Sequence, residues 1–238
     1  MSFEYIPSAS RGGGDYGWLK TRYSFSFANY YDPTKMGFGV LRVINDDWIG
    51  PQSGFGEHQH ANMEIITIPF VGTLSHKDST GGEGNIGAGE VQVMSAGTGV
   101  VHSEYNHTDA PVELFQIWIE PKSYGVAPRY DQKAFNFEPK NNQLVLVVSS
   151  DGRENSLAIH QDALVYRGTY SEEKVERYQI TPGNGVYLII RVGQVKVGDI
   201  VLTQGDALSV SEESELRLDI TPESDFVLLE IPPFHNAL

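Results

Sequence analysis

Cysteine is absent from the 238 residues of this chain. Its absence excludes disulfide bonds, thiolate metal ligands and cysteine nucleophiles. Basic residues are scarce: 17 Lys and Arg stand against 31 Asp and Glu, which gives a formal net charge of −14. A surface that holds nucleic acid needs clustered Lys and Arg to neutralise phosphates. We therefore expect no direct binding of nucleic acid.

Long apolar runs are also missing. No stretch approaches the roughly 18 apolar residues that cross a bilayer, and residues Met1 to Ile6 lack the basic and apolar regions of a signal peptide. We therefore expect a cytoplasmic protein that does not span a membrane. Two G-x-G-x-x-G matches begin at Gly12 and Gly82, but we expect neither to open a helix, which argues against a dinucleotide site. The nucleophile motif G-x-S-x-G is absent.

Short β-branched and aromatic segments fill most of the chain, separated by Gly, Pro, Asn and Asp. Leu114 to Ile119, Val186 to Val192 and Phe226 to Ile231 are examples. Such a pattern is typical of an all-β sandwich or barrel. Only around Gln132 to Phe135 does the sequence allow a short helix.

The same punctuation occurs twice along the chain, in Gly72, Gly89 and Pro121 and again in Gly193, Gly205 and Pro232. This repeat predicts two related β-barrels with a boundary between Lys122 and Asn142. We divide the chain into residues 1–125 and 126–238.

Histidine is concentrated in the first half, where five of the seven lie between residues 58 and 107. His58 and His60 are two residues apart, as are His102 and Glu104. Alternate residues of a strand point to one face, so two neighbouring strands can bring three imidazoles and a carboxylate together. That donor set suits a divalent transition metal rather than Ca²⁺ or Mg²⁺. We expect His76 and His107 to be structural or surface residues, because both lie near turns.

Six segments carry a resemblance to a known family: Phe25 to Pro33, Leu41 to Asp47, His58 to His60, His76 to Ser79, Ser95 to Gly99 and His102 to Asn106. Together they resemble the pirin family of the cupin superfamily, and most closely its bacterial quercetin 2,3-dioxygenase members. The resemblance is dense from about Gly17 to Pro121 and thinner to the end of the chain.

This resemblance implies a bicupin, in which two antiparallel β-barrels pack face to face and only the N-terminal one keeps a metal site. Its ligands would be His58, His60, His102 and Glu104, all present here. In the second half, Gln179 and Thr181 occupy the positions that correspond to the first two histidines when Gly193 is aligned with Gly72. The second barrel should therefore bind no metal.

The carboxylate ligand has an alternative. In many other cupins it follows the H-x-H pair by about four residues, which here is Glu64. Glu64 shares a face with the two histidines if the strand runs straight. We favour Glu104 on the family pattern and leave Glu64 open.

The function that the resemblance implies is metal-dependent cleavage of flavonols such as quercetin by O2 to a depside and carbon monoxide. Glu104, as ligand or after leaving the metal, is the expected catalytic base for the flavonol hydroxyl. Fe(II) is the favoured metal, with Cu, Ni, Co or Zn as alternatives. A flat substrate needs flat walls, for which the sequence neighbours of the ligands are candidates: Phe55, Met63, Tyr105 and Phe115.

An alternative function has no chemical step. Eukaryotic members of this family are described as transcription cofactors whose iron state alters binding, so the chain can instead be a metal-binding, iron-sensing regulator. Because the sequence has no basic patch, such a regulator would act through a protein partner. In either case we expect a monomer.

Overall fold

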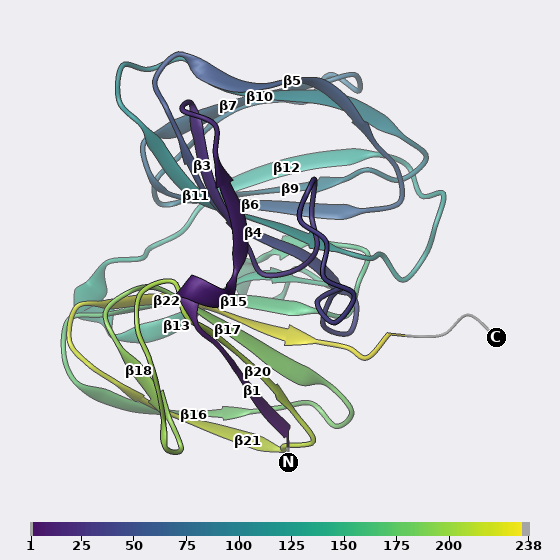
Figure 1. Cartoon of the computed structure of the whole chain (residues 1–238). Helices are drawn as coiled ribbons and strands as arrows, with labels where there is room; N and C mark the ends of the chain where they lie inside the picture. Colours follow the sequence, from purple (N-terminus) through teal and green to yellow (C-terminus); the bar gives the residue numbers. More distant parts are fainter. Residues whose placement is uncertain (1, 235–238) are drawn as a thin grey trace.

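The computed structural model describes residues 2–234 of the chain as an all-β molecule. Three single-turn 3-10 helices interrupt the strands, at Ser8–Ser10, Pro139–Asn141 and Arg153–Asn155. Among the described residues, no helix has the length and apolar character needed to span a membrane. The predicted all-β bicupin architecture is confirmed, and Figure 1 shows its two halves one above the other.

The upper half in Figure 1, which we call the first barrel, consists of a seven-stranded and a four-stranded sheet. The seven-stranded sheet has the strand order β12 (Arg129–Ala134), β9 (Glu90–Ser95), β6 (Glu64–Val71), β11 (Val112–Ile119), β4 (Leu41–Ile49), β3 (Leu19–Tyr23) and β2 (Gly12–Asp15). The four-stranded sheet has the order β5 (Ser53–His60), β10 (Val100–Asn106), β7 (Thr73–Asp78) and β8 (Glu83–Gly87).

The lower half, the second barrel, repeats this plan. Its seven-stranded sheet has the order β1 (Ser2–Ile6), β20 (Ala207–Ser211), β17 (Gly185–Val192), β22 (Ser224–Ile231), β15 (Leu164–Tyr170), β13 (Gln143–Ser149) and β14 (Leu157–Ala158). Its four-stranded sheet has the order β16 (Lys174–Gln179), β21 (Glu215–Ile220), β18 (Val195–Val197) and β19 (Ile200–Leu202).

The two seven-stranded sheets pack against each other through one apolar core. Ile66 and Ile117 from the first barrel and Val165 and Leu229 from the second all belong to this buried cluster. Because strand side chains alternate between faces, the other face of each seven-stranded sheet is left to line the inside of its own barrel. The inner faces therefore decide what each barrel can hold.

Two strands join the barrel of the other half of the chain. β1 pairs with β20 in the second barrel, and β12 pairs with β9 in the first; Figure 1 shows the N-terminal strand lying along the lower half. The division into residues 1–125 and 126–238 stays a prediction, and these exchanges cross it. Residues 129–134 form β12, so the short helix that the sequence allowed around Gln132 does not form: pairing with β9 outweighs the local preference.

The inside of the second barrel is filled with apolar side chains. Leu188, Leu208, Leu216 and Leu228 belong to a single buried cluster there. Gln179 and Thr181 are exposed, and the neighbouring Tyr178 is the buried residue of β16. Glycine spacing therefore aligned the two barrels out of register, although no histidine lies inside this barrel among the described residues.

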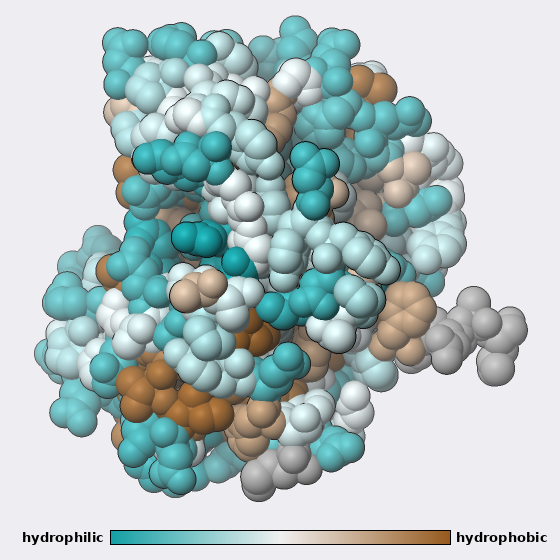
Figure 2. All heavy atoms as spheres, viewed as in Figure 1, coloured by the Kyte–Doolittle hydropathy of each residue, from teal (hydrophilic) through white to brown (hydrophobic). Residues whose placement is uncertain are grey.

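The exterior also differs between the halves in the view of Figure 2. Hydrophilic and neutral residues dominate the upper barrel on this face, whereas hydrophobic residues gather over part of the lower one. The excess of acidic residues in the sequence is consistent with the hydrophilic character of much of this surface.

Candidate metal centre

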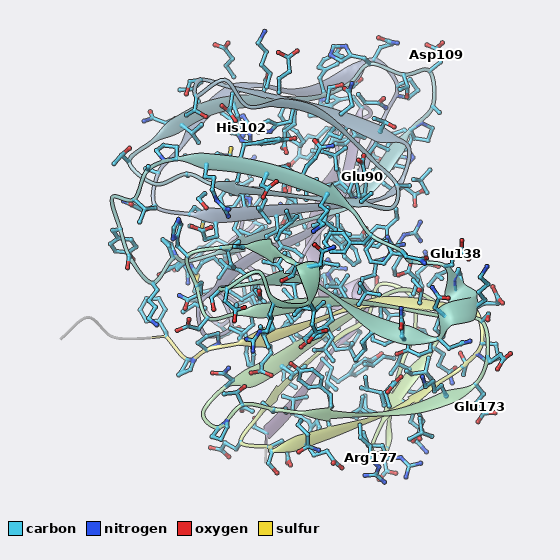
Figure 3. All side chains as sticks on the ribbon, turned by 180° about the vertical axis from the view of Figure 1, so that it is seen from behind. Glu90, His102, Asp109, Glu138, Glu173 and Arg177 are labelled. Atoms are coloured by element: carbon cyan, nitrogen blue, oxygen red, sulfur yellow. The ribbon has the colours of Figure 1, made fainter. Side chains whose placement is uncertain are left out.

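Strands β5 and β10 bring three histidines together inside the first barrel. His58 and His102 are direct cross-strand partners, and His60, two residues along, pairs with Val100. The ring centroids of His58 and His102 are 4.3 Å apart, and those of His60 and His102 are 4.9 Å apart. One nitrogen from each of the three rings lies within 4.8 Å of the others. Figure 3 places His102 within the upper barrel.

A β-bulge sets the position of the carboxylate beside them. The register shifts between His102 and Glu104, so that Glu104 lies opposite Phe55 rather than Gly56. Close approach at this bulge requires Gly54, where a Cβ atom would lie 2.2 Å from the carbonyl oxygen of Glu104. The bulge thus keeps His102 and Glu104 on the inner face while it displaces the strand opposite.

The donor atoms of the three histidines suit a metal. Nε2 of His60 and Nε2 of His102 are buried and have no hydrogen-bond partner among the described residues. Nδ1 of His58 lies 2.8 Å from the carbonyl oxygen of Gly56, which leaves Nε2 of His58 for another partner. Burial lowers the pKa of His60 to about 4 and that of His102 to about 3, and neighbouring His58 adds to both effects. These two rings are therefore neutral near pH 7, the state in which imidazole binds metal.

Glu104 is fully enclosed and held by an amide. Nε2 of Gln116 lies 3.1 and 2.9 Å from the two carboxylate oxygens, and Thr67 donates its hydroxyl to Oε1 of Gln116 at 2.8 Å. Burial raises the pKa of Glu104, while the hydrogen bond from Gln116 acts in the opposite direction. The carboxylate groups with His76 and His102 rather than with the other two histidines. Glu104 therefore adjoins the three-histidine cluster through His102 and stands to one side of it.

His76 is buried beside His102, which excludes the surface position that we had allowed for it. Nδ1 of His76 lies 3.4 Å from Nδ1 of His102, and Nε2 of His76 lies 3.0 Å from Oδ2 of Asp78. If His102 donates from Nδ1 and His76 donates from Nε2, the chain of contacts ends on a carboxylate and leaves Nε2 of His102 facing the cluster. Carboxylate and histidine partners of this kind orient metal-binding imidazoles.

The alternative carboxylate, Glu64, faces away from the histidines. The chain turns between β5 and β6 at Asn62, whose φ is +50°, so the strand does not run straight. Glu64 shares the face of Ile66, which packs into the core between the barrels, and its Oε2 accepts a hydrogen bond from Ser95 at 2.7 Å. Glu64 therefore lies outside the histidine cluster and outside the residues that line its cavity.

A cavity of about 440 Å³ opens beside the histidines. His58, His60, His102 and Glu104 line it, together with aromatic residues that come mainly from outside β5 and β10: Tyr16, Trp18, Tyr23, Phe27, Phe55 and Trp118.

Of the four candidate wall residues, only Phe55 lines this cavity. Met63 packs in a small separate cluster, Tyr105 donates its hydroxyl outside to Gln52, and Phe115 lies in the core between the barrels. These three are core or outer residues rather than walls: Tyr105 and Phe115 are strand neighbours of Glu104 and Gln116 and point to the opposite face, and Met63 follows the turn at Asn62.

Comparison with known proteins agrees with this architecture. The Pirin family model matches residues 6–119, and the model described as the quercetinase C-terminal cupin domain matches residues 146–231. A protein of Escherichia coli K12 named quercetin 2,3-dioxygenase is 42% identical over 231 residues, which cover 96% of this chain and 99% of that protein. The chain belongs to the pirin family.

Other relatives share its length and fold. A pirin-like protein of Caulobacter vibrioides is 39% identical, with 94% of this chain and 97% of that protein covered. The crystal structure of YhhW from Escherichia coli superposes with a TM-score of 0.93 at 39% identity and covers 99% of this chain and all of that one. A second structure, of the bacterial pirin YhhW in complex with nickel(II), has a TM-score of 0.92 at 39% identity and covers 98% of this chain and 100% of that one.

Proposed function

We propose that this protein is a metal-dependent dioxygenase that cleaves flavonols such as quercetin with O2 to a depside and carbon monoxide. The observation that carries the proposal is the junction of three clustered imidazoles with a cavity lined by aromatic rings. Its volume of about 440 Å³ is in the range of sites for small organic ligands.

His58, His60 and His102 are the proposed ligands of a divalent transition metal, with Glu104 as the fourth. Bound there, such a metal would lower the pKa of the flavonol 3-hydroxyl and promote its reaction with O2. Fe(II) is our favoured metal, and Cu, Ni, Co and Zn suit the same donors. The nickel(II) complex of the related YhhW supports a transition metal here without identifying the native one.

Glu104 is also the proposed catalytic base. Its carboxylate lines the cavity and is shielded from solvent, and burial raises its pKa. A carboxylate with a raised pKa takes a proton from a phenolic hydroxyl more readily than one in water does. Gln116 fixes the orientation of both carboxylate oxygens and keeps the group beside the substrate.

The aromatic walls account for a flat substrate. Trp118 stacks edge-on against His60 at a centroid distance of 4.8 Å, and Phe27 packs edge-on against Trp118 at 5.3 Å. Tyr16 and Trp18, which also line the cavity, are partly exposed, as expected for residues at its mouth. Such a wall favours a planar ring over a flexible chain because ring faces and edges pack together.

Oxygen uptake tests this proposal. Protein reconstituted with Fe(II) without air should consume O2 in the presence of quercetin and lose the absorbance of the flavonol. His102→Ala should reduce the rate to that of free metal, whereas His107→Ala changes an exposed histidine outside the cavity and should keep the wild-type rate. Stoichiometric metal without O2 uptake would contradict the enzyme and favour a metal-binding regulator.

A further inference from the structure

The inner face of the seven-stranded sheet in the first barrel carries a row of polar side chains. In cross-strand register, Gln92 pairs with Thr67, Thr67 with Gln116, and Gln116 with Asn45. Asp47 lies two residues beyond Asn45 on β4 and shares its face. This sheet faces the four-stranded sheet that supplies the histidines, so the cavity lies between a metal-binding wall and a second polar wall.

Among the described residues, three side-chain oxygens of that second wall line the cavity without a hydrogen-bond partner: Oγ1 of Thr21, Oδ1 of Asn45 and Oδ1 of Asp47. Asn45 and Asp47 are only 4% and 5% exposed, respectively. A buried polar atom without a partner is destabilising, so its presence in a cavity indicates a group that a ligand or an ordered water completes.

The environment of Asp47 adds to this picture. Burial raises the pKa of Asp47 to about 7, and the charges of Asp46 and Glu104 raise it further, whereas the Thr21 hydroxyl and Arg11 lower it. Near neutral pH the carboxyl group of Asp47 therefore exists in both its protonated and its ionised form. It can accept a hydrogen bond from a hydroxyl or donate one to an oxygen.

We propose that Asn45 and Asp47 form a hydroxyl-binding subsite that holds a polyhydroxylated aromatic substrate on the wall facing the histidines. This inference rests on the proposed function, because it assigns a second anchor to a substrate whose first anchor is the metal centre. The side-chain oxygens recognise hydroxyl groups, while Tyr23, Phe27 and Trp118 of the same cavity contact the ring faces and edges. A ring system without further hydroxyls leaves both oxygens unpaired.

Two flavonols distinguish binding at the metal centre from binding at the hydroxyl subsite. Quercetin and 3-hydroxyflavone share the 3-hydroxyl and 4-keto groups, but 3-hydroxyflavone has no other hydroxyl. Their dissociation constants are measured by absorbance titration with Zn(II)-loaded protein, because Zn(II) has no redox chemistry. Wild-type protein should bind quercetin about tenfold more tightly than 3-hydroxyflavone, the effect of one or two net hydrogen bonds.

The variants Asn45→Leu and Asp47→Leu remove the two oxygens and keep the branched shape of the side chains. Each should lower the preference for quercetin severalfold, and both together should abolish it, with 3-hydroxyflavone binding changed by no more than about twofold. If Asp47→Leu does not fold, Asp47→Ala replaces it. Arg42→Gln is the matched control, because it removes a charge from the same strand, where Arg42 pairs with Glu120 at 3.1 Å outside this cavity.

The outcomes distinguish this subsite from the proposed function. Loss of the preference in the Asn45 and Asp47 variants, with Arg42→Gln like wild type, supports the subsite. Equal binding of both flavonols by wild-type protein, or an unchanged preference in the double variant, overturns the subsite and leaves the metal-centred function intact. Failure of both flavonols to bind overturns the proposed function and the subsite with it.

Discussion

The two barrels share one strand plan but differ in what fills them. In the first barrel the cross-strand row inside the large sheet is Gln92, Thr67, Gln116 and Asn45; in the second it is Leu208, Leu188, Leu228 and Tyr166. The small sheets differ in the same way: β10 buries His102, Glu104 and Asn106, whereas β21 buries Leu216, Leu218 and Ile220.

This contrast separates stability from chemistry. The second barrel gains stability from burying apolar area. The first barrel buries imidazoles, carboxylates and amides that are costly to desolvate, and it leaves room for a ligand. Because the two large sheets share a core, the apolar barrel supports the polar one.

The histidine cluster should respond most strongly to substitution. His102→Ala removes the central imidazole, so metal content should fall from about one ion per chain to about a tenth or less. The fold should persist, because the second barrel is untouched. Elemental analysis after dialysis and circular dichroism check both points, with His107→Ala as control. Full metal content in the variant would contradict the ligand assignment.

Asp47 tests the cost of the polar interior through its pH dependence. The pKa of Asp47 is raised to about 7 in the folded chain from an ordinary value of 3.8. The folded state therefore holds an extra proton between these values, and stability is lost as pH rises through this window.

Asp47→Asn should accordingly increase the free energy of unfolding at pH 8, by on the order of 2 to 4 kcal/mol, and the gain should shrink towards pH 4. Urea unfolding of metal-free protein at the two pH values measures it. A gain that is equal at both values would show that the charge of Asp47 is not the cause.

Exchanging one inner residue between the barrels sharpens the contrast. Leu228→Gln places an unpaired amide in the packed barrel and should cost about 3 kcal/mol of folding stability. The reverse change at the matching position, Gln116→Leu, should cost less, but it removes the donor to Glu104 and should lower turnover. Thermal unfolding and O2 uptake on both variants compare them. Equal loss of stability in the two barrels would refute the proposed division of roles.

The partners of His102 should have a smaller effect. His76→Phe and Asp78→Asn interrupt the contacts behind this ring and should each weaken metal binding about 10- to 100-fold. Lys77→Ala lies between them on the exposed face of β7 and serves as control. Competition with a chelator of known affinity measures the constants. Wild-type affinity in both variants would make His76 a packing residue only.

Much of the site followed from local sequence. Strand alternation predicted that His58 and His60 point to the same side of one strand and that His102 and Glu104 point to the same side of another. The structure places all four around one cavity. The family resemblance supplied the grouping of the four residues into one ligand set, which no local pattern contains. Glu104 lies beside His76 because the two are direct partners in the pairing of β10 with β7, which alternation alone does not predict.

Other features depended on contacts far apart in the sequence. Tyr16 and Trp18 reach the cavity from the hairpin of β2 and β3, and Asp47 reaches it from β4. The contact between His76 and His102 was not predicted, because the two residues are 26 positions apart in the sequence. Glu64 was kept as an alternative ligand on the assumption of a straight strand. The turn at Asn62 instead places its side chain on the opposite face.

Carbon monoxide release tests the central claim most directly. With Fe(II)-loaded protein and quercetin, the account predicts about one CO formed and one O2 consumed for each flavonol lost, with the rate of the His102→Ala variant no higher than that of free Fe(II). Loss of quercetin without CO, or the same CO yield from His102→Ala, would contradict flavonol cleavage at this metal centre.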